Sequence, residues 1–119
     1  MATYSTIKGQ TIQSLASDPG LPGVAGATWA SGTALNVAKA IMGHAGTQTA
    51  GLVFGGSLPA LTDTTESYNG SAWTEVADLN TARTDTGGCG ATNIAALYVG
   101  GSTPPATAIV ESWDGTSWS

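Results

Sequence analysis

The sequence predicts an all-β fold in which a unit of four short antiparallel strands occurs twice. Three observations support this prediction. The chain of 119 residues contains an internal repeat, its apolar residues come in short runs bounded by glycine, and no segment has a convincing helical period. Residues 33–42 come closest to a helical pattern, but their repeat partner is rich in loop-forming residues. The length allows one modest domain rather than two independent cores.

The repeat is detected when the chain is shifted by 45 positions. This shift pairs residues 42–73 with 87–118, and 13 of the 32 pairs are identical. A shift of 44 extends the match backwards, so that Trp29 pairs with Trp73. A length change of one residue near 40–41 would reconcile the two shifts. Both tryptophans and both Gly-Gly pairs align, which a biased composition alone would not produce.

Each unit contains four strand patterns in the same order. The first is rich in glycine and threonine, the second is apolar and ends in Gly-Gly, the third carries a glutamate and an aromatic residue, and the fourth begins at a tryptophan. Between the third and fourth patterns, Asn69-Gly70 and Asp114-Gly115 suit tight hairpins with positive φ. The expected strands cover about 43–49, 50–56, 64–70 and 72–77 in the first unit, and 88–94, 95–101 and 108–115 in the second.

Four short antiparallel strands in 40–50 residues are typical of a β-propeller blade. The order of glycine pair, aromatic residue and tryptophan resembles the kelch repeat in particular, although the gap between the two aromatic residues is shorter here. The resemblance covers about residues 29–119. It implies that nine residues serve blade packing and assembly: Gly55, Gly56, Tyr68, Trp73, Gly100, Gly101, Trp113, Trp118 and Trp29.

The resulting domain organisation has two parts. Residues 1–28 form an N-terminal segment of different composition, and 29–119 form the two blade repeats. Within the second part, 29–36 is expected to be the fourth strand of a blade, 37–78 the first repeat, and 79–119 a second repeat that lacks its own fourth strand.

Two blades cannot close a ring, so we expect the chain to assemble with copies of itself. Residues 29–34 would complete the last blade of a neighbouring chain by strand addition, which also removes an exposed sheet edge. Two blades per chain give four, six or eight blades for two, three or four chains, and a homotrimer with six blades is favoured. The alternative is that the chain is a fragment of a longer propeller.

The N-terminal segment resembles the start of tail-fibre-like virion proteins of bacteriophages, especially marine and cyanobacterial ones. The matching residues are Met1–Tyr4, Ile7–Gly9, Ile12–Gln13, Leu15 and Ser17–Pro19, with LNTAR, GTQTA and YNGSAWTE in the repeats. In such proteins Tyr-Asn usually follows the spacer tryptophan, whereas this chain has Ala30-Ser31, so Trp29 could belong to this segment. Its distance of 44 residues from Trp73 and the recurring Leu-Asn pair favour the blade instead. The resemblance implies a virion protein made in the host cytoplasm, with host surface glycans as candidate ligands.

Composition excludes several other functions. The net charge is −5 with only three basic residues, which cannot form the cationic surface that nucleic acid or an anionic membrane requires. No stretch is long enough to span a membrane, and the first residues do not resemble a secretory signal.

Few residues are candidates for chemistry. His44 and Cys89 are the only residues of their kinds, so we expect no intrachain disulfide, no metal site and no cofactor. They pair at the shift of 45 on the expected innermost strands, where a packing or channel-lining role is expected; the alternative is a symmetric metal ring formed in an oligomer. Glu66 and Glu111 are also equivalent, and we expect both to be structural rather than catalytic.

The sequence thus predicts a non-enzymatic structural or binding protein. The alternative is a self-assembling propeller fragment or designed module without a ligand.

Overall fold

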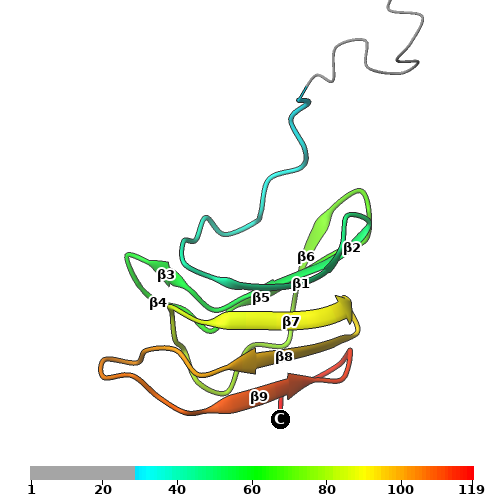
Figure 1. Cartoon of the computed structure of the whole chain (residues 1–119). Coiled ribbons are helices and arrows are strands. Elements are labelled where there is room, and N and C mark those ends of the chain that lie inside the picture. The colour runs from blue at the N-terminus through cyan, green and yellow to red at the C-terminus, as the bar shows by residue number, and fades with distance from the viewer. Residues whose placement is uncertain (1–28) are drawn as a thin grey trace, which may run out of the picture. The chain divides into compact units, whose positions relative to one another are not determined.

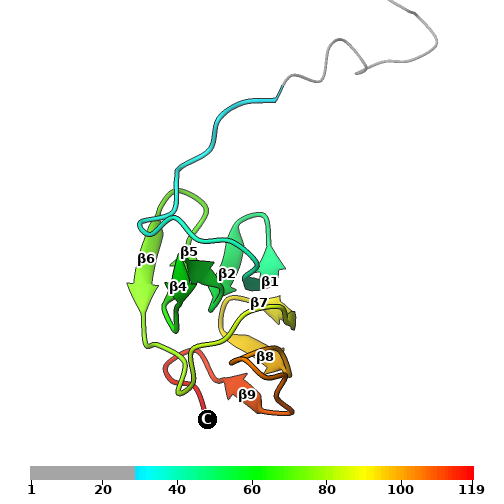
Figure 2. The same cartoon turned by 90° about the vertical axis from the view of Figure 1, so that its left-hand side faces the viewer.

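The computed structural model describes residues 29–119, so the expected N-terminal segment, 1–28, lies outside the described residues. This described part is all-β, as the sequence predicted, and contains no helix that could cross a membrane. Its strands form two main antiparallel sheets, which are stacked in Figures 1 and 2, and one small hairpin.

The first sheet has four strands, in the order β1-β2-β5-β6. Neighbouring strands are antiparallel throughout. The turn between β5 and β6 contains the predicted Asn69-Gly70, where Gly70 has φ +96°. The Asn69 side-chain oxygen accepts hydrogen bonds from the backbone N–H groups of Ser71 and Ala72. The strands and the hairpin that interrupts them are β1 (Gly43–Thr47), β2 (Ala50–Phe54), β3 (Ser57–Leu58), β4 (Ala60–Leu61), β5 (Thr65–Tyr68) and β6 (Trp73–Val76).

The second sheet has three strands: β7 (Gly87–Thr92), β8 (Ala95–Val99) and β9 (Val110–Trp113). At the position of a fourth strand, Trp118 forms an isolated bridge with Trp113. The intervening turn is held by Asp114, whose carboxylate accepts hydrogen bonds from two backbone N–H groups. These bonds lower the pKa of the Asp114 carboxyl group.

The strand register places the length difference between the repeats inside β7. Gly43 pairs with Phe54, and Gly87 pairs with Val99. Because Phe54 and Val99 are equivalent at the shift of 45, Gly43 and Gly87 are structural equivalents although they lie 44 positions apart. The register of β7 then shifts between Cys89 and Thr92, which is a β-bulge. The length change expected near 40–41 is therefore wrong. Ile41 and Asp85 are still equivalent at the shift of 44, and both have positive φ, so the change in length lies after them.

Each sheet has two faces, which we name by their residues. The leucine face carries Leu52, Phe54, Thr65 and Ser67 in the first sheet and Leu97, Val99, Val110 and Ser112 in the second. The tryptophan face carries Val53, Tyr68 and Trp73 in the first sheet and Tyr98, Trp113 and Trp118 in the second. The leucine face of the first sheet packs against the tryptophan face of the second, and the core lies between them.

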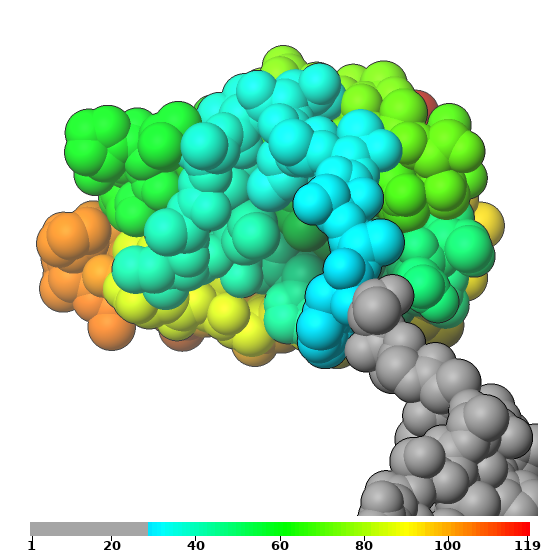
Figure 3. Space-filling view, turned by 90° about the horizontal axis from the view of Figure 1, so that it is seen from above, coloured from blue at the N-terminus to red at the C-terminus, as the bar shows by residue number. Residues whose placement is uncertain are grey.

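Residues 32–42, which precede β1, run along the first sheet, as the space-filling view shows (Figure 3). Residues 29–36 form no strand within the single chain. Their expected role as the fourth strand of a neighbouring blade therefore stays a prediction.

Candidate assembly interface

Three aromatic rings form the centre of the contact between the sheets. Phe54 makes edge-on contacts with Tyr98 and Trp118, each with ring centroids 4.9 Å apart. The Trp118 indole N–H donates a hydrogen bond of 3.0 Å to the Thr65 hydroxyl, so its polar atom is satisfied in the core. Burial of aromatic area with this geometry makes a large contribution to stability.

The two first strands, β1 and β7, lie side by side at this contact (Figure 1). Their approach requires a glycine at position 88. A Cβ atom there would lie 2.6 Å from the His44 carbonyl oxygen and 2.7 Å from the Phe54 ring. Any larger residue would force the sheets apart, so the glycine content of the first strands reflects packing between neighbouring sheets.

A buried ion pair fixes the segment that enters the second sheet. Arg83 is fully buried, and its guanidinium donates a hydrogen bond to the carboxylate of Glu111. The same carboxylate accepts hydrogen bonds from the backbone and side-chain N–H groups of Asn80. The guanidinium also lies 4.1 Å from the centroid of the Tyr98 ring. This network satisfies the charges that burial would otherwise penalise.

The Tyr98 phenol is part of the same arrangement. Its hydroxyl donates a hydrogen bond of 2.8 Å to the Arg83 carbonyl oxygen. Burial of the phenol raises the pKa of Tyr98 to about 12, because the charged phenolate would lose its solvation.

The first repeat has an equivalent network. The Lys39 ammonium lies 3.7 Å from the Glu66 carboxylate, which accepts hydrogen bonds from the backbone N–H groups of Asn36 and Val37. Burial lowers the pKa of Lys39, and the charge of Glu66 opposes that shift. Sequence reasoning assigned a structural role to both glutamates but missed their basic partners. The signal was present, since Asn36 and Lys39 recur as Asn80 and Arg83 at the shift of 44.

The two predicted Gly-Gly pairs end the second strand of each sheet. Gly55, Gly56, Gly100 and Gly101 all have positive φ, between 64° and 103°, which glycine adopts without a steric cost. The Gly56 N–H donates a hydrogen bond of 2.9 Å to the Arg83 carbonyl oxygen, and this bond joins the two repeats. The glycines therefore let the chain leave each sheet, and at Gly56 the chain contacts the second repeat.

The predicted aromatic residues have different environments. Trp113 and Trp118 are buried, Tyr68 and Trp73 are half-buried, and Trp29 is fully exposed. Because Trp118 itself fills the tryptophan position of the second repeat, that position is not vacant for Trp29 of another chain. The strand exchange, which stays a prediction, would therefore involve the residues after Trp29.

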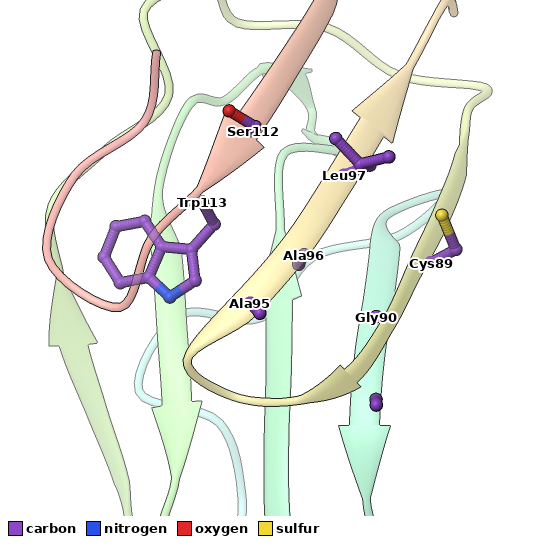
Figure 4. Close-up of a pocket in the computed structure, with 8 residues that line it drawn as sticks. Cys89, Gly90, Ala95, Ala96, Leu97, Ser112 and Trp113 are labelled. Carbon is purple, nitrogen blue, oxygen red and sulfur yellow. The ribbon is translucent and has the colours of Figure 1, made fainter.

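Equivalent positions on the two leucine faces differ sharply in exposure. Leu52, Phe54 and Thr65 are fully buried, whereas their partners Leu97, Val99 and Val110 are 42%, 46% and 53% exposed. A hollow of about 420 Å³ opens beside this exposed face and is bordered by Cys89, Leu97 and Ser112 (Figure 4). The second sheet thus presents an apolar surface that nothing in residues 29–119 covers.

His44 and Cys89 are not structural equivalents, which corrects the pairing made at the shift of 45. His44 pairs with Val53 on a tryptophan face, whereas Cys89 pairs with Leu97 on a leucine face. Both side chains are exposed in the single chain. Among residues 29–119, no group of three His, Cys, Asp or Glu residues is close enough to hold a metal ion.

Comparison with known proteins adds no functional assignment. No protein-family model matches the chain, and no curated protein matches it with significance.

Proposed function

We propose that this protein is a non-enzymatic structural module that associates with copies of itself to form a β-propeller of kelch-like blades. Each main sheet is one blade, and three chains supply the six blades of the favoured ring. The protein assembles through two sheet faces that have no sheet packed on them within residues 29–119, and the ligand of each face is another copy of the chain.

The unequal exposure of equivalent residues carries this proposal. A leucine face becomes a core where a second sheet covers it, as at Leu52 and Phe54, and the same face stays exposed at Leu97 and Val99. Apolar residues that cluster on one face favour association over exposure to water. A further sheet packed on this face would bury the exposed residues as the second sheet buries those of the first.

The proposed biological setting is a bacteriophage virion, in the tail or a tail fibre. Support comes from the resemblance of residues 1–28 and of the repeats to virion proteins. In that setting the outer surface of the ring would contact host glycans. The second candidate is a self-assembling module without a ligand, which the uncovered apolar face supports equally well.

The mass of the 119-residue chain in solution tests the proposed assembly. Light scattering after size exclusion is expected to give three times the mass of one chain, which is 11.8 kDa. Two or four chains would keep the assembly and change the number of blades. A folded monomer at micromolar concentration would overturn the proposal. A glycan array would then separate the two candidates, since reproducible binding supports the virion adhesin and silence across many sugars supports the module without a ligand.

A further inference from the structure

The contact between the two sheets is a template for a second contact that the single chain does not make. Within the chain, the leucine face of the first sheet is covered by the tryptophan face of the second. The leucine face of the second sheet and the tryptophan face of the first have no sheet packed on them among residues 29–119. The tryptophan face of the first sheet carries the bonds of Asn36 and Val37 to Glu66. The packed face of the second sheet likewise carries the bond of Asn80 to Glu111. The two faces without a packed sheet lie on opposite sides of the stacked pair.

We infer that a second copy of the chain docks head to tail, with the tryptophan face of its first sheet on the leucine face of the second sheet. This inference rests on the proposed assembly and specifies its interface. The occupant is a second copy because, within residues 29–119, the sheet that fits a leucine face is the one that presents the tryptophan face of the neighbouring repeat. A contact between two different faces repeats from chain to chain, and it closes into a ring when the rotation between neighbouring chains divides a full turn.

The turns between the first and second strands carry matching polar groups. The Asn93 side chain donates hydrogen bonds of 3.0 Å to the Ser67 hydroxyl and 3.2 Å to the Tyr68 carbonyl oxygen, across the contact between the sheets. Its equivalent in the first repeat is Gln48, which is also an amide and is exposed. The equivalent of Ser67 is Ser112, which borders the hollow on the uncovered face. The Gln48 amide of the docked copy would therefore donate to Ser112.

Side-chain sizes are also complementary at the strand that must approach most closely. In the existing contact, the large Phe54 on the leucine face meets Gly88. In the second contact the strand register gives Val99 in place of Phe54 and His44 in place of Gly88. A smaller residue on one side is thus matched by a larger residue on the other, so the imidazole of the docked copy would fill the space that Val99 leaves.

A third correspondence lies in the backbone. The Gly56 N–H donates to the Arg83 carbonyl oxygen across the existing contact. The equivalents of these groups are the Gly101 N–H and the Lys39 carbonyl oxygen. Gly101 has nearly the same φ as Gly56, +103° against +100°, so its N–H has the orientation needed to donate to Lys39 of the docked copy.

Two single substitutions test the head-to-tail arrangement, because each blocks a different face. Val99→Glu places a charge on the leucine face of the second sheet, and His44→Glu places one on the tryptophan face of the first. Both side chains are exposed, so the fold of the single chain is retained. The matched control is Ile94→Glu, which adds the same charge to an exposed apolar residue in the turn between β7 and β8.

The expected result depends on mixing. Each face variant alone is monomeric, the mixture of the two forms a particle of two chains and no larger, and the control assembles like the wild type. The particle of two chains arises because only one intact pair of faces remains in the mixture. If the wild type assembles but the mixture stays monomeric, or if either variant assembles normally, the inferred interface is wrong while the proposed assembly stands. A monomeric wild type overturns both.

A second experiment tests the size match directly. Val99→Phe copies the existing contact on one side only, so it is expected to clash with His44 and weaken assembly by about tenfold or more. Adding His44→Gly copies both sides and is expected to restore assembly to within about threefold of the wild type. Failure of the double variant to recover would overturn the placement of His44 over Val99. The readout is the concentration at which the particle dissociates, measured by light scattering.

Discussion

The two sheets contain nearly the same residues in opposite surroundings. Leu52 and Leu97 occupy the same position of the repeat, yet the first is fully buried and the second is 42% exposed. Thr65 and Val110 show the same difference even though the exposed residue is the more apolar one. The residue type therefore specifies which face of a sheet packs, whereas the presence of a neighbouring sheet decides whether that face is buried.

The largest expected difference between the two sheets comes from shortening one side chain on each leucine face to alanine. Phe54→Ala is expected to lower the free energy of unfolding by about 3–5 kcal/mol, because it removes a buried ring from the core. Val99→Ala is expected to change it by less than about 0.5 kcal/mol in dilute solution. Urea denaturation followed by tryptophan fluorescence measures both. An equal loss at Val99 in the dilute monomer would show that the two faces do not differ as described.

The ion pairs allow a second comparison of the repeats. Arg83→Met leaves the Glu111 carboxylate buried without its charged partner and is expected to cost about 3–5 kcal/mol. Lys39→Met is expected to cost less, about 1–3 kcal/mol, because the ammonium lies 3.7 Å from Glu66 and bonds mainly to Thr64. The same denaturation measurement applies, with Arg83→Lys as the control that keeps the charge. A larger loss at Lys39 than at Arg83 would reverse this comparison.

Adjacent glycines in β7 give a sharper test of close packing. Gly88→Ala is expected to destabilise the chain by about 1–3 kcal/mol, because the new methyl group would overlap the His44 backbone. Gly87→Ala is the matched control, since a Cβ atom at that position meets nothing within 4 Å. Similar stabilities of the two variants would mean that β1 and β7 are farther apart than described.

The smallest expected effect is the pH dependence that Tyr98 adds. Its pKa is about 12 in the folded chain and about 10 in the unfolded chain, so its contribution is fully present below pH 10. Between about pH 10 and 12 the unfolded state releases the proton first, and the free energy of unfolding falls.

Tyr98→Phe is expected to remove that part of the decline and to cost about 1 kcal/mol at neutral pH through the lost hydrogen bond to Arg83. Denaturation midpoints of both proteins across this pH range give the comparison. Identical profiles above pH 10 would contradict the role assigned to Tyr98.

Most of the strand pattern could be predicted from the sequence because local signals specify it. Asn69-Gly70 and Asp114-Gly115 define the tight turns, and the apolar runs before each Gly-Gly pair define the second strands. The all-β class follows from these signals and is confirmed. The assignment of the sheets to propeller blades and the ring that they would form stay predictions, since they concern contacts beyond one chain.

Other features depend on distant contacts and were out of reach. The partner of Glu111 lies 28 positions earlier in the chain. The recurrence of Lys39 as Arg83 marks both basic residues as part of the repeat, but it does not show which acidic residue each of them meets. Similarly, the sequence alignment of His44 with Cys89 ignored the register that the second strands impose on the first. Only strand pairing, which compares each residue with one on another strand, shows that Gly88 is the equivalent of His44.

The bulge in β7 has a consequence for how such repeats diverge. It absorbs an additional residue next to the turn, so that Gly88 still meets Phe54 and Thr92 still pairs next to the hairpin. Two repeats can therefore differ by one residue at the end of the first strand, while equivalent positions still meet between the sheets. Insertions and deletions in related sequences are expected to concentrate at this point, and an alignment made without a gap there will misplace the residues nearest the interface.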